Sequence, residues 1–204
     1  MPAQPRIILA SASPRRRELL ATLGLAFEVV PSDVDESIEE RDPRAGAELL
    51  ARRKAEAVAA EHPDALVIGS DTIVALDGHM LGKPEDAEEA RTMLRGLRGR
   101  PHQVVTGVAA ILGGREESSH AWTTVHMRPY PDDAIEAFIA TGSPFDKAGG
   151  YAIQDEAFAP VERFEGCRCA VIGLPLGLLR TLLARFGIET RQPDVECPVC
   201  GSDA

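Results

Sequence analysis

Long apolar runs are missing from this chain of 204 residues. A membrane-spanning helix needs about 18 or more consecutive apolar residues, and no run approaches that length. The first six residues, MPAQPR, also lack the basic segment and the apolar core of a secretory leader. We therefore expect a cytoplasmic protein that has no membrane partner.

Positive charge is also in short supply. The chain has 22 Lys and Arg residues against 32 Asp and Glu residues, so its formal net charge is −10. Binding to a nucleic-acid backbone requires a broad basic face, which this balance does not favour. We expect no nucleic-acid partner, and any recognition of phosphate must be local.

Cysteine is sparse as well, with four residues in two close pairs, too few for the disulfide framework of a secreted protein of this length. The tail sequence CPVCG resembles a zinc knuckle, in which Cys197 and Cys200 present two thiolates to one ion. Cys167 and Cys169 would complete such a site. Three interpretations stay open: a structural Zn²⁺ site with four cysteine ligands, free thiols on a frayed tail, or a reducible disulfide.

Apolar periodicity predicts alternating strands and helices. Strand-like runs occupy residues 6–10, 27–30, 65–69, 73–76, 103–112 and 117–127, and helical patterns occupy residues 14–23, 43–62, 85–97, 132–140 and 176–185. Turn signals at Asp77-Gly78 and Gly113-Gly114 join neighbouring strands as hairpins. Helices mixed with hairpins predict an α/β or α+β fold around a mixed sheet, in a domain at 1–187 followed by a tail at 188–204.

The stretch LASASPRRREL joins the first strand to the first helix. Ser13, followed by proline, is suited to cap the helix, so three arginines fall in a first turn where the helix dipole is already positive. Free N–H groups, the hydroxyls of Ser11 and Ser13, and the guanidinium groups of Arg15 and Arg16 would suit a phosphate there. The alternative is an ordinary serine cap with solvated arginines.

A carboxylate interrupts the apolar run LVIGSDTIVAL. A charged group in a strand buried on both faces is costly unless it is paired, metal-bound or at a sheet edge. Asp71 is therefore the strongest single candidate for chemistry, although a β-turn between two short strands would also explain it. Two weaker signals are Lys83, held between glycine and proline, and DKAGGYAIQ, whose paired glycines allow close approach to a ligand and whose strand-like run ends at Gln154.

Two glycine-rich nucleotide-binding patterns, the phosphate loop GxxxxGK[ST] and the dinucleotide fingerprint GxGxxG, are absent. Instead, seven motifs in order resemble the Maf family of nucleoside triphosphate pyrophosphatases. They are SASPRR from Ser11, DVDE from Asp33, RKA from Arg53, GSDT from Gly69, GKP from Gly82, DKAGGYAIQ from Asp146 and GLPL from Gly173. Such an ordered set of motifs is very specific.

The resemblance implies an elongated α/β domain related to the inosine triphosphatase fold, with a twisted mixed sheet flanked by helices and two lobes around a cleft. It also implies cleavage of a nucleoside triphosphate between its α and β phosphates, which gives the monophosphate and pyrophosphate. Family members are often homodimers. The family is also linked to arrest of cell division, so the alternative function is a nucleotide-sensing regulatory protein.

The resemblance further implies which residues carry the reaction. Asp71 is the expected proton acceptor, and the oxygens of Glu36 and Asp71 are the expected ligands of a divalent cation, Mg²⁺ or Mn²⁺. The expected phosphate-binding residues are Ser11, Ser13, Arg16, Lys54, Lys83 and Lys147.

Three positions bear on the choice of nucleotide. Arg15, Thr72 and Gln154 match the branch of the family that acts on dTTP and UTP, not the branch that acts on 7-methyl-GTP. The carboxamide of Gln154 offers a donor and an acceptor, which complement the ring N–H and a carbonyl of uracil or thymine.

Overall fold

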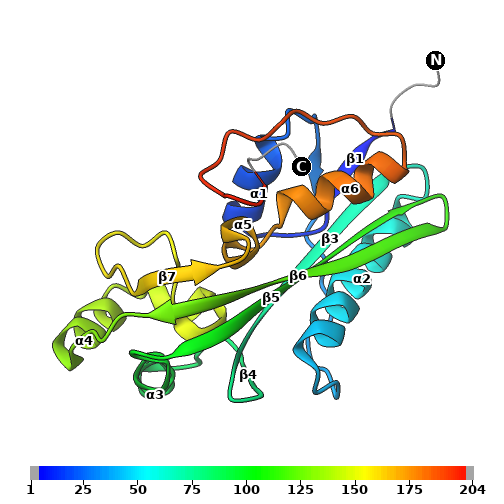
Figure 1. Cartoon of the computed structure of the whole chain (residues 1–204). Helices are drawn as coiled ribbons and strands as arrows, with labels where there is room; N and C mark the ends of the chain where they lie inside the picture. Colours follow the sequence, from blue (N-terminus) through cyan, green and yellow to red (C-terminus); the bar gives the residue numbers. More distant parts are fainter. Residues whose placement is uncertain (1–4, 201–204) are drawn as a thin grey trace.

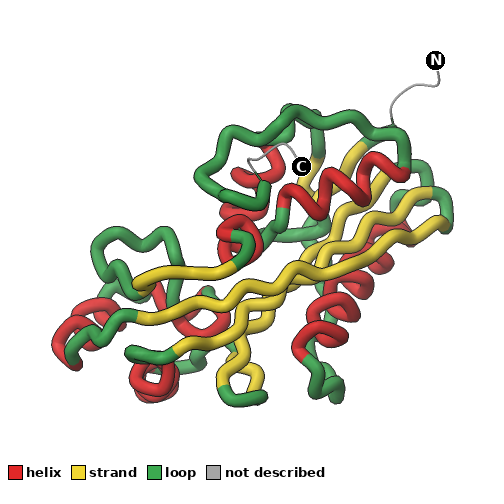
Figure 2. The backbone as a smooth tube through the Cα atoms, in the orientation of Figure 1, coloured by secondary structure: helices red, strands yellow, loops and turns green. Residues whose placement is uncertain are grey.

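One mixed sheet runs the length of an elongated molecule in the computed structural model, which describes residues 5–200 (Figures 1 and 2). Its strand order is β2-β1-β3-β5-β6-β7, and β4 pairs with β3. The pairs β1–β2 and β1–β3 are parallel and the others are antiparallel, which confirms the predicted mixed sheet. The strands are β1 (Ile7–Leu9), β2 (Glu28–Val29), β3 (Leu66–Leu76), β4 (His79–Leu81), β5 (Pro101–Leu112), β6 (Arg115–Met127) and β7 (Val161–Glu165).

Helices cover both faces of this sheet and one end of it (Figure 1). The α-helices are α1 (Pro14–Ala21), α2 (Pro43–Glu61), α3 (Ala87–Leu97), α4 (Asp132–Ala140), α5 (Arg168–Ile172) and α6 (Leu176–Arg185), and two 3₁₀ turns are η1 (Ser143–Asp146) and η2 (Ala148–Gly150). Because side chains alternate along a strand, Ile7 and Leu9 join a core with α1 and α6, whereas Ile8 and Ala10 join a core with α2.

A separate apolar core fills the opposite end of the molecule. It contains Leu94 of α3, Ile135 of α4 and Tyr151, packed against Val104 of β5 and Val125 of β6. The cavity described below is lined both by residues that precede α1 and by Tyr151. Two lobes therefore flank a cleft, as the family resemblance implied.

Helix α2 lies unusually close to the sheet because two strand positions lack side chains. A Cβ atom at Gly69 of β3 would lie 2.2 Å from the carbonyl oxygen of Ala51, and one at Gly107 of β5 would lie 2.2 Å from that of Ala47. Only glycine permits this approach of helix backbone to strand. The approach brings Lys54, a buried residue of α2, to the centre of β3.

Two expectations from the sequence are wrong, and two short elements were not predicted. Residues 65–69 and 73–76 do not form two strands, because β3 continues through Asp71, so the β-turn interpretation of Asp71 fails. The run that ends at Gln154 is not a strand; it forms η2 and then a turn. The patterns also missed the short elements β7 and α5.

The tail beyond α6 packs against the lobe that contains α1. Ile188 is buried in the core with α1 and α6, and the N–H of Arg191 donates to the carbonyl of Leu23 at 2.9 Å. Cys197 and Cys200 belong to the same core. The last residue of the CPVCG motif and the first four residues of the expected 1–187 domain lie outside the described residues.

No helix within residues 5–200 is both long enough and apolar enough to cross a membrane.

Candidate active site

One edge of β3 is open at its centre. On the side away from β5, β1 pairs with Leu66–Ile68 and β4 pairs with Val74–Leu76, and no described strand pairs with the residues between. A cavity of about 730 Å³ lies at this gap. Side chains from both faces of β3 line it, including Asp71 and Thr72. This unpaired edge of β3 explains how Asp71, a charged residue, can lie at the centre of an otherwise buried strand.

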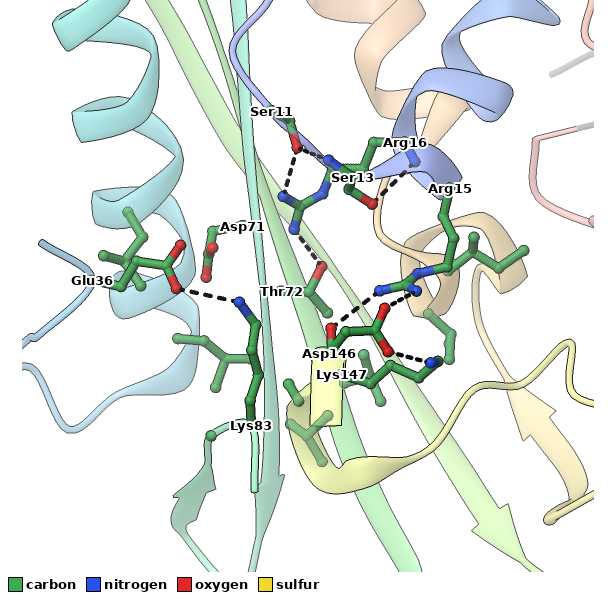
Figure 3. Close-up of a pocket in the computed structure, with 18 of the residues that line it drawn as sticks. Ser11, Ser13, Arg15, Arg16, Glu36, Asp71, Thr72, Lys83, Asp146 and Lys147 are labelled. Atoms are coloured by element: carbon green, nitrogen blue, oxygen red, sulfur yellow. Dashed lines mark hydrogen bonds and ion pairs between the residues drawn. The ribbon is translucent and has the colours of Figure 1, made fainter. Parts of the chain in front are cut away.

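On the α2 face of β3, Asp71 meets a cation and a second carboxylate. Lys54 of α2 is 6% exposed, and its Nζ lies 2.5 Å from Oδ1 of Asp71 and 2.6 Å from Oε1 of Glu36. Glu36 comes from the loop before α2, and its Oε2 lies 4.0 Å from Nζ of Lys83 (Figure 3). Partial burial alone would raise the pKa of Glu36, but the hydrogen bond and charge of Lys54 outweigh it, so the pKa falls below its usual value.

On the opposite face, the guanidinium of Arg16 joins three parts of the chain, and Figure 3 shows its bonds to Ser11 and Thr72. It donates to Oγ of Ser11 at 3.3 Å, to Oγ1 of Thr72 at 3.3 Å and to the carbonyl oxygen of Gly173 at 3.0 Å. Burial lowers the pKa of Arg16, against the attraction of Asp71 and Glu36. A guanidinium has five N–H donors, so donors remain for a ligand.

The start of α1 faces this cavity as an anion site requires. The hydroxyl of Ser13 accepts the backbone N–H of Arg16 at 3.4 Å, and the hydroxyl of Ser11 accepts the N–H of Ser13 at 3.2 Å. Both serines and Arg15 line the cavity, whereas Arg17 is exposed and does not. The helix dipole therefore adds to the positive potential at the cavity wall.

Asp146, a carboxylate to which the sequence motifs assigned no role, holds two cationic side chains in place at the cavity. Asp146 accepts a hydrogen bond from Arg15 at 2.8 Å and pairs with the ammonium of Lys147, which also donates to the carbonyl of Ser143 at 2.5 Å (Figure 3). Burial would raise the pKa of Asp146, but Lys147 and Arg15 outweigh it and lower it. The sequence feature that could have identified Asp146 is its position as the first residue of the motif DKAGGYAIQ.

Gln154 lies in an exposed turn that also lines the cavity. The neighbouring Tyr151 is buried and shares a 2.6 Å hydrogen bond with Nε2 of His102, a buried residue of β5. Burial, with a smaller effect of His126, lowers the pKa of His102 to about 4, so this imidazole is neutral near pH 7. The neutral pair fixes one end of the segment that carries Gln154.

All of the predicted phosphate, metal and specificity residues line the same cavity, although they come from distant parts of the sequence. Five of the lining side chains are cationic and three are carboxylates. A chain of net charge −10 thus places a local excess of positive charge at this one cavity. The predicted cysteine site is separate from it.

The carboxylate oxygens of this cavity fit a hard divalent cation. Glu36 and Asp71 come from different elements, yet both reach the ammonium of Lys54. Mg²⁺ typically takes one or two carboxylates and completes its shell with waters and substrate phosphates. Within residues 5–200, the only group of three or more candidate metal ligands is the four cysteines, so other ligands in the cavity would be water and phosphate.

A family model described as Maf-like protein matches residues 6–186 of the chain. The chain belongs to the Maf family. The dTTP/UTP pyrophosphatase of Thermomicrobium roseum is 52% identical over 198 residues, which cover 95% of this chain and 91% of the relative. The dTTP/UTP pyrophosphatase of Moorella thermoacetica is 50% identical over 187 residues, which cover 90% of this chain and 96% of the relative.

The Maf match includes all seven motifs and ends before the cysteines of the tail. Among solved structures, a nucleoside-triphosphatase / dITP/XTP pyrophosphatase of Mycobacterium abscessus has 18% sequence identity to this Maf chain and a TM-score of 0.40. The likeness covers 62% of this chain and 76% of the other.

Proposed function

We propose that this Maf protein hydrolyses dTTP and UTP to the nucleoside monophosphate and pyrophosphate. The observation that carries the proposal is the cavity at the open edge of β3, where Asp71 faces the same space as five cationic side chains. The relatives named dTTP/UTP pyrophosphatase, about half identical to this chain over most of its length, support the choice of substrate.

The triphosphate binds where the positive charge is concentrated. Arg16, Ser11 and Ser13 hold phosphate oxygens at the start of α1, and Lys83 and Lys147 add positive charge in the same cavity. Arginine binds phosphate through two parallel donors, whereas lysine acts as a point charge. The arrangement neutralises a substrate that the acidic chain as a whole would repel.

Hydrolysis requires a water molecule that is activated and aligned with the bridging P–O bond. Asp71 accepts one proton of the water, the water oxygen bonds to phosphorus, and the bond between the α and β phosphates breaks as pyrophosphate leaves. Lys54 holds the Asp71 carboxylate at 2.5 Å and fixes its orientation. Glu36 and Asp71 would hold the Mg²⁺ or Mn²⁺ that the family resemblance implies, which supplies charge neutralisation on the phosphate oxygens.

The proposed base recognition rests on three residues that line the cavity, namely Arg15, Thr72 and Gln154. Thr72 bonds to Arg16 and to Oγ1 of Thr106 at 2.9 Å, so its position is fixed from both sides. Arg15 is held by Asp146. Gln154 is exposed and makes no side-chain hydrogen bond within the described residues, so its carboxamide is available to pair with a pyrimidine.

The test is release of pyrophosphate from a panel of nucleotides, with and without Mg²⁺. We expect turnover of dTTP and UTP to exceed that of 7-methyl-GTP, and Asp71→Asn to lower turnover by about 10²- to 10⁴-fold while nucleotide binding persists. Asp64→Asn, a change at an exposed position outside the cavity, is the matched control and should behave as the unchanged protein.

Three outcomes would count against the proposal. Near-normal turnover by Asp71→Asn would refute the role of that carboxylate. Faster turnover of 7-methyl-GTP would refute the assignment of Arg15, Thr72 and Gln154. Nucleotide binding by the unchanged protein without any hydrolysis would favour the regulatory alternative.

Homodimer formation and a cytoplasmic location stay predictions of the sequence.

A further inference from the structure

The four cysteines, which the hydrolytic site does not use, meet in one buried cluster. None is more than 5% exposed, and their four Sγ atoms all lie within 4.8 Å of one another. The Sγ of Cys167 is 3.7 Å from that of Cys197 and 3.2 Å from that of Cys200. All four are free thiols, so no disulfide accounts for this convergence.

The spacing matches a tetrahedral metal site. Zinc binds thiolate sulfur at about 2.3 Å, which places the four sulfurs of a tetrahedron about 3.8 Å apart. A single disulfide would use only two of the four sulfurs, whereas one tetrahedral ion uses all four. Soft thiolates in a closed set of four select zinc over the hard cations that suit the carboxylates of the cavity.

The backbone around the cluster is arranged to stabilise thiolates. The N–H of Ala170 donates to Sγ of Cys167 at 3.3 Å, and the N–H of Gly177, near the start of α6, donates to Sγ of Cys200 at 3.3 Å. Hydrogen bonds and helix N-termini both favour the ionised form of cysteine. Figure 1 shows the tail (red) crossing α1 and returning to the start of α6, which brings its two cysteines to this place.

We propose that Cys167, Cys169, Cys197 and Cys200 bind one structural Zn²⁺ ion, which fastens the tail to the α5 segment and so fixes the carbonyl of Gly173 that orients Arg16. Binding converts the four thiols to thiolates and releases their protons. The ion takes no part in hydrolysis.

The link from the cluster to the cavity is short and consists of hydrogen bonds. Helix α5 begins at Arg168, between two of the cysteines, and ends at the cap residue Gly173. The carbonyl of Gly173 accepts from Nε of Arg16 and from Oγ of Ser70, each at 3.0 Å. Thr106 of β5 donates to the carbonyl of Ala170 at 2.7 Å. Loss of the ion would release one end of this segment, and Arg16 would lose a fixed acceptor.

The first measurement is metal content, which does not depend on hydrolysis. The full-length protein is incubated with one equivalent of Zn²⁺ under reducing conditions, desalted and analysed for metals. We expect about one zinc per chain, little in Cys197→Ser/Cys200→Ser, and a full equivalent in Val199→Ser. Val199 is 54% exposed between the two cysteines, so this control places a serine in the same loop without removing a ligand.

A second measurement keeps the test independent of how well the double variant folds. Co²⁺ added to the unchanged protein should give the absorption of a tetrahedral thiolate complex, and one equivalent of Zn²⁺ should displace it. Less than half an equivalent of zinc, iron in its place, or a Cys–Cys disulfide found by mass spectrometry under reducing conditions would overturn the proposal.

The link to Arg16 is tested in excess Mg²⁺, so that the cation proposed for the cavity is not limiting. We expect Cys197→Ser/Cys200→Ser to raise KM for dTTP by about tenfold with a smaller change in kcat, as for a weakened substrate contact. Unchanged KM in a folded, zinc-free double variant would overturn the link to Arg16 while the proposed hydrolysis stands. Absence of hydrolysis in every variant would instead refute the proposed function.

Discussion

The two faces of β3 carry different chemistry at neighbouring positions. On the α2 face, Asp71 contacts Lys54, which also contacts Glu36, so opposite charges offset one another. On the other face, Thr72 contacts Arg16, whose side chain donates hydrogen bonds to two hydroxyls and a carbonyl within residues 5–200. Because successive side chains point to opposite faces, one strand separates the groups proposed for acid–base chemistry from those proposed to bind phosphate. Both sets line the cavity at the open edge.

The largest effect should come from breaking the ion pair on the α2 face. Lys54→Met leaves the carboxylate of Asp71 buried without its partner, and removal of one member of a buried pair typically costs about 3–5 kcal/mol. We expect the free energy of unfolding, measured in urea, to fall by that order. The double variant Lys54→Met/Asp71→Asn should recover much of the loss, because its neutral amide needs no counter-ion.

Lys83→Met is the control for that experiment. The Lys83 side chain is 57% exposed, and its nearest carboxylate oxygen is 4.0 Å away, so its removal should change stability by less than about 1 kcal/mol. Equal stability of Lys54→Met and the unchanged protein would show that the α2 face does not depend on charge balance.

A smaller effect, on substrate binding, should come from changing Arg16, which lies on the opposite face of β3. Arg16→Lys keeps the positive charge but cannot contact Ser11, Thr72 and Gly173 together, so we expect KM for dTTP to rise about 10- to 100-fold with a smaller change in kcat. Steady-state kinetics of pyrophosphate release measures both. Arg17→Lys, at an exposed neighbouring position, should leave both constants unchanged. Similar kinetic constants for Arg16→Lys and Arg17→Lys would show that the contacts of Arg16 on this face of β3 do not contribute to substrate binding.

The smallest effect should be a difference in acid sensitivity. The pKa of Glu36 in the folded protein lies below its ordinary value of 4.5, so its ionised form stabilises the fold above that pH. This contribution is lost as pH falls through the folded pKa. The Glu36 side chain is 50% exposed, so we expect no more than about 1 kcal/mol.

The corresponding measurement compares unfolding free energies as pH is lowered from about 6 to about 3, because the folded pKa of Glu36 lies below 4.5. The stability difference between the unchanged protein and Glu36→Gln should shrink over that interval. The difference between the unchanged protein and Arg16→Lys should stay constant, because neither cation titrates there. A constant difference for Glu36→Gln would show that its carboxylate gains nothing from Lys54.

Local patterns predicted most of the fold because apolar residues repeat along β1, β5 and β6 and along α2. They failed at Asp71, where three polar residues suggested a turn. The strand continues because Asp71 pairs directly with Gly107 of β5, while the other edge lies open to the cavity. The elements β7 and α5 have only five residues each, too few to show a period.

The motifs also indicated which residues line the cavity, but the contacts between those residues could not be predicted. Arg16 and Gly173 are separated by 157 positions, and Arg15 and Asp146 by 131. Only the folded sheet and the path of α5 determine that these groups meet. Motifs therefore point to residues that gather at the cavity, whereas the pairing of Asp146 with Arg15 and Lys147 became visible only in the structure.

Gly69 and Gly107, which lie under α2, limit which substitutions the fold can accept. Every other amino acid at Gly69 or Gly107 brings a Cβ to about 2.2 Å from a helix carbonyl, so α2 must lift off the sheet. Lys54 would travel with it, away from Asp71. Gly69 and Gly107, which have no functional groups, thus set how closely Lys54 can approach Asp71. Substitutions at these two glycines should lower activity although the chemical groups of the cavity stay the same.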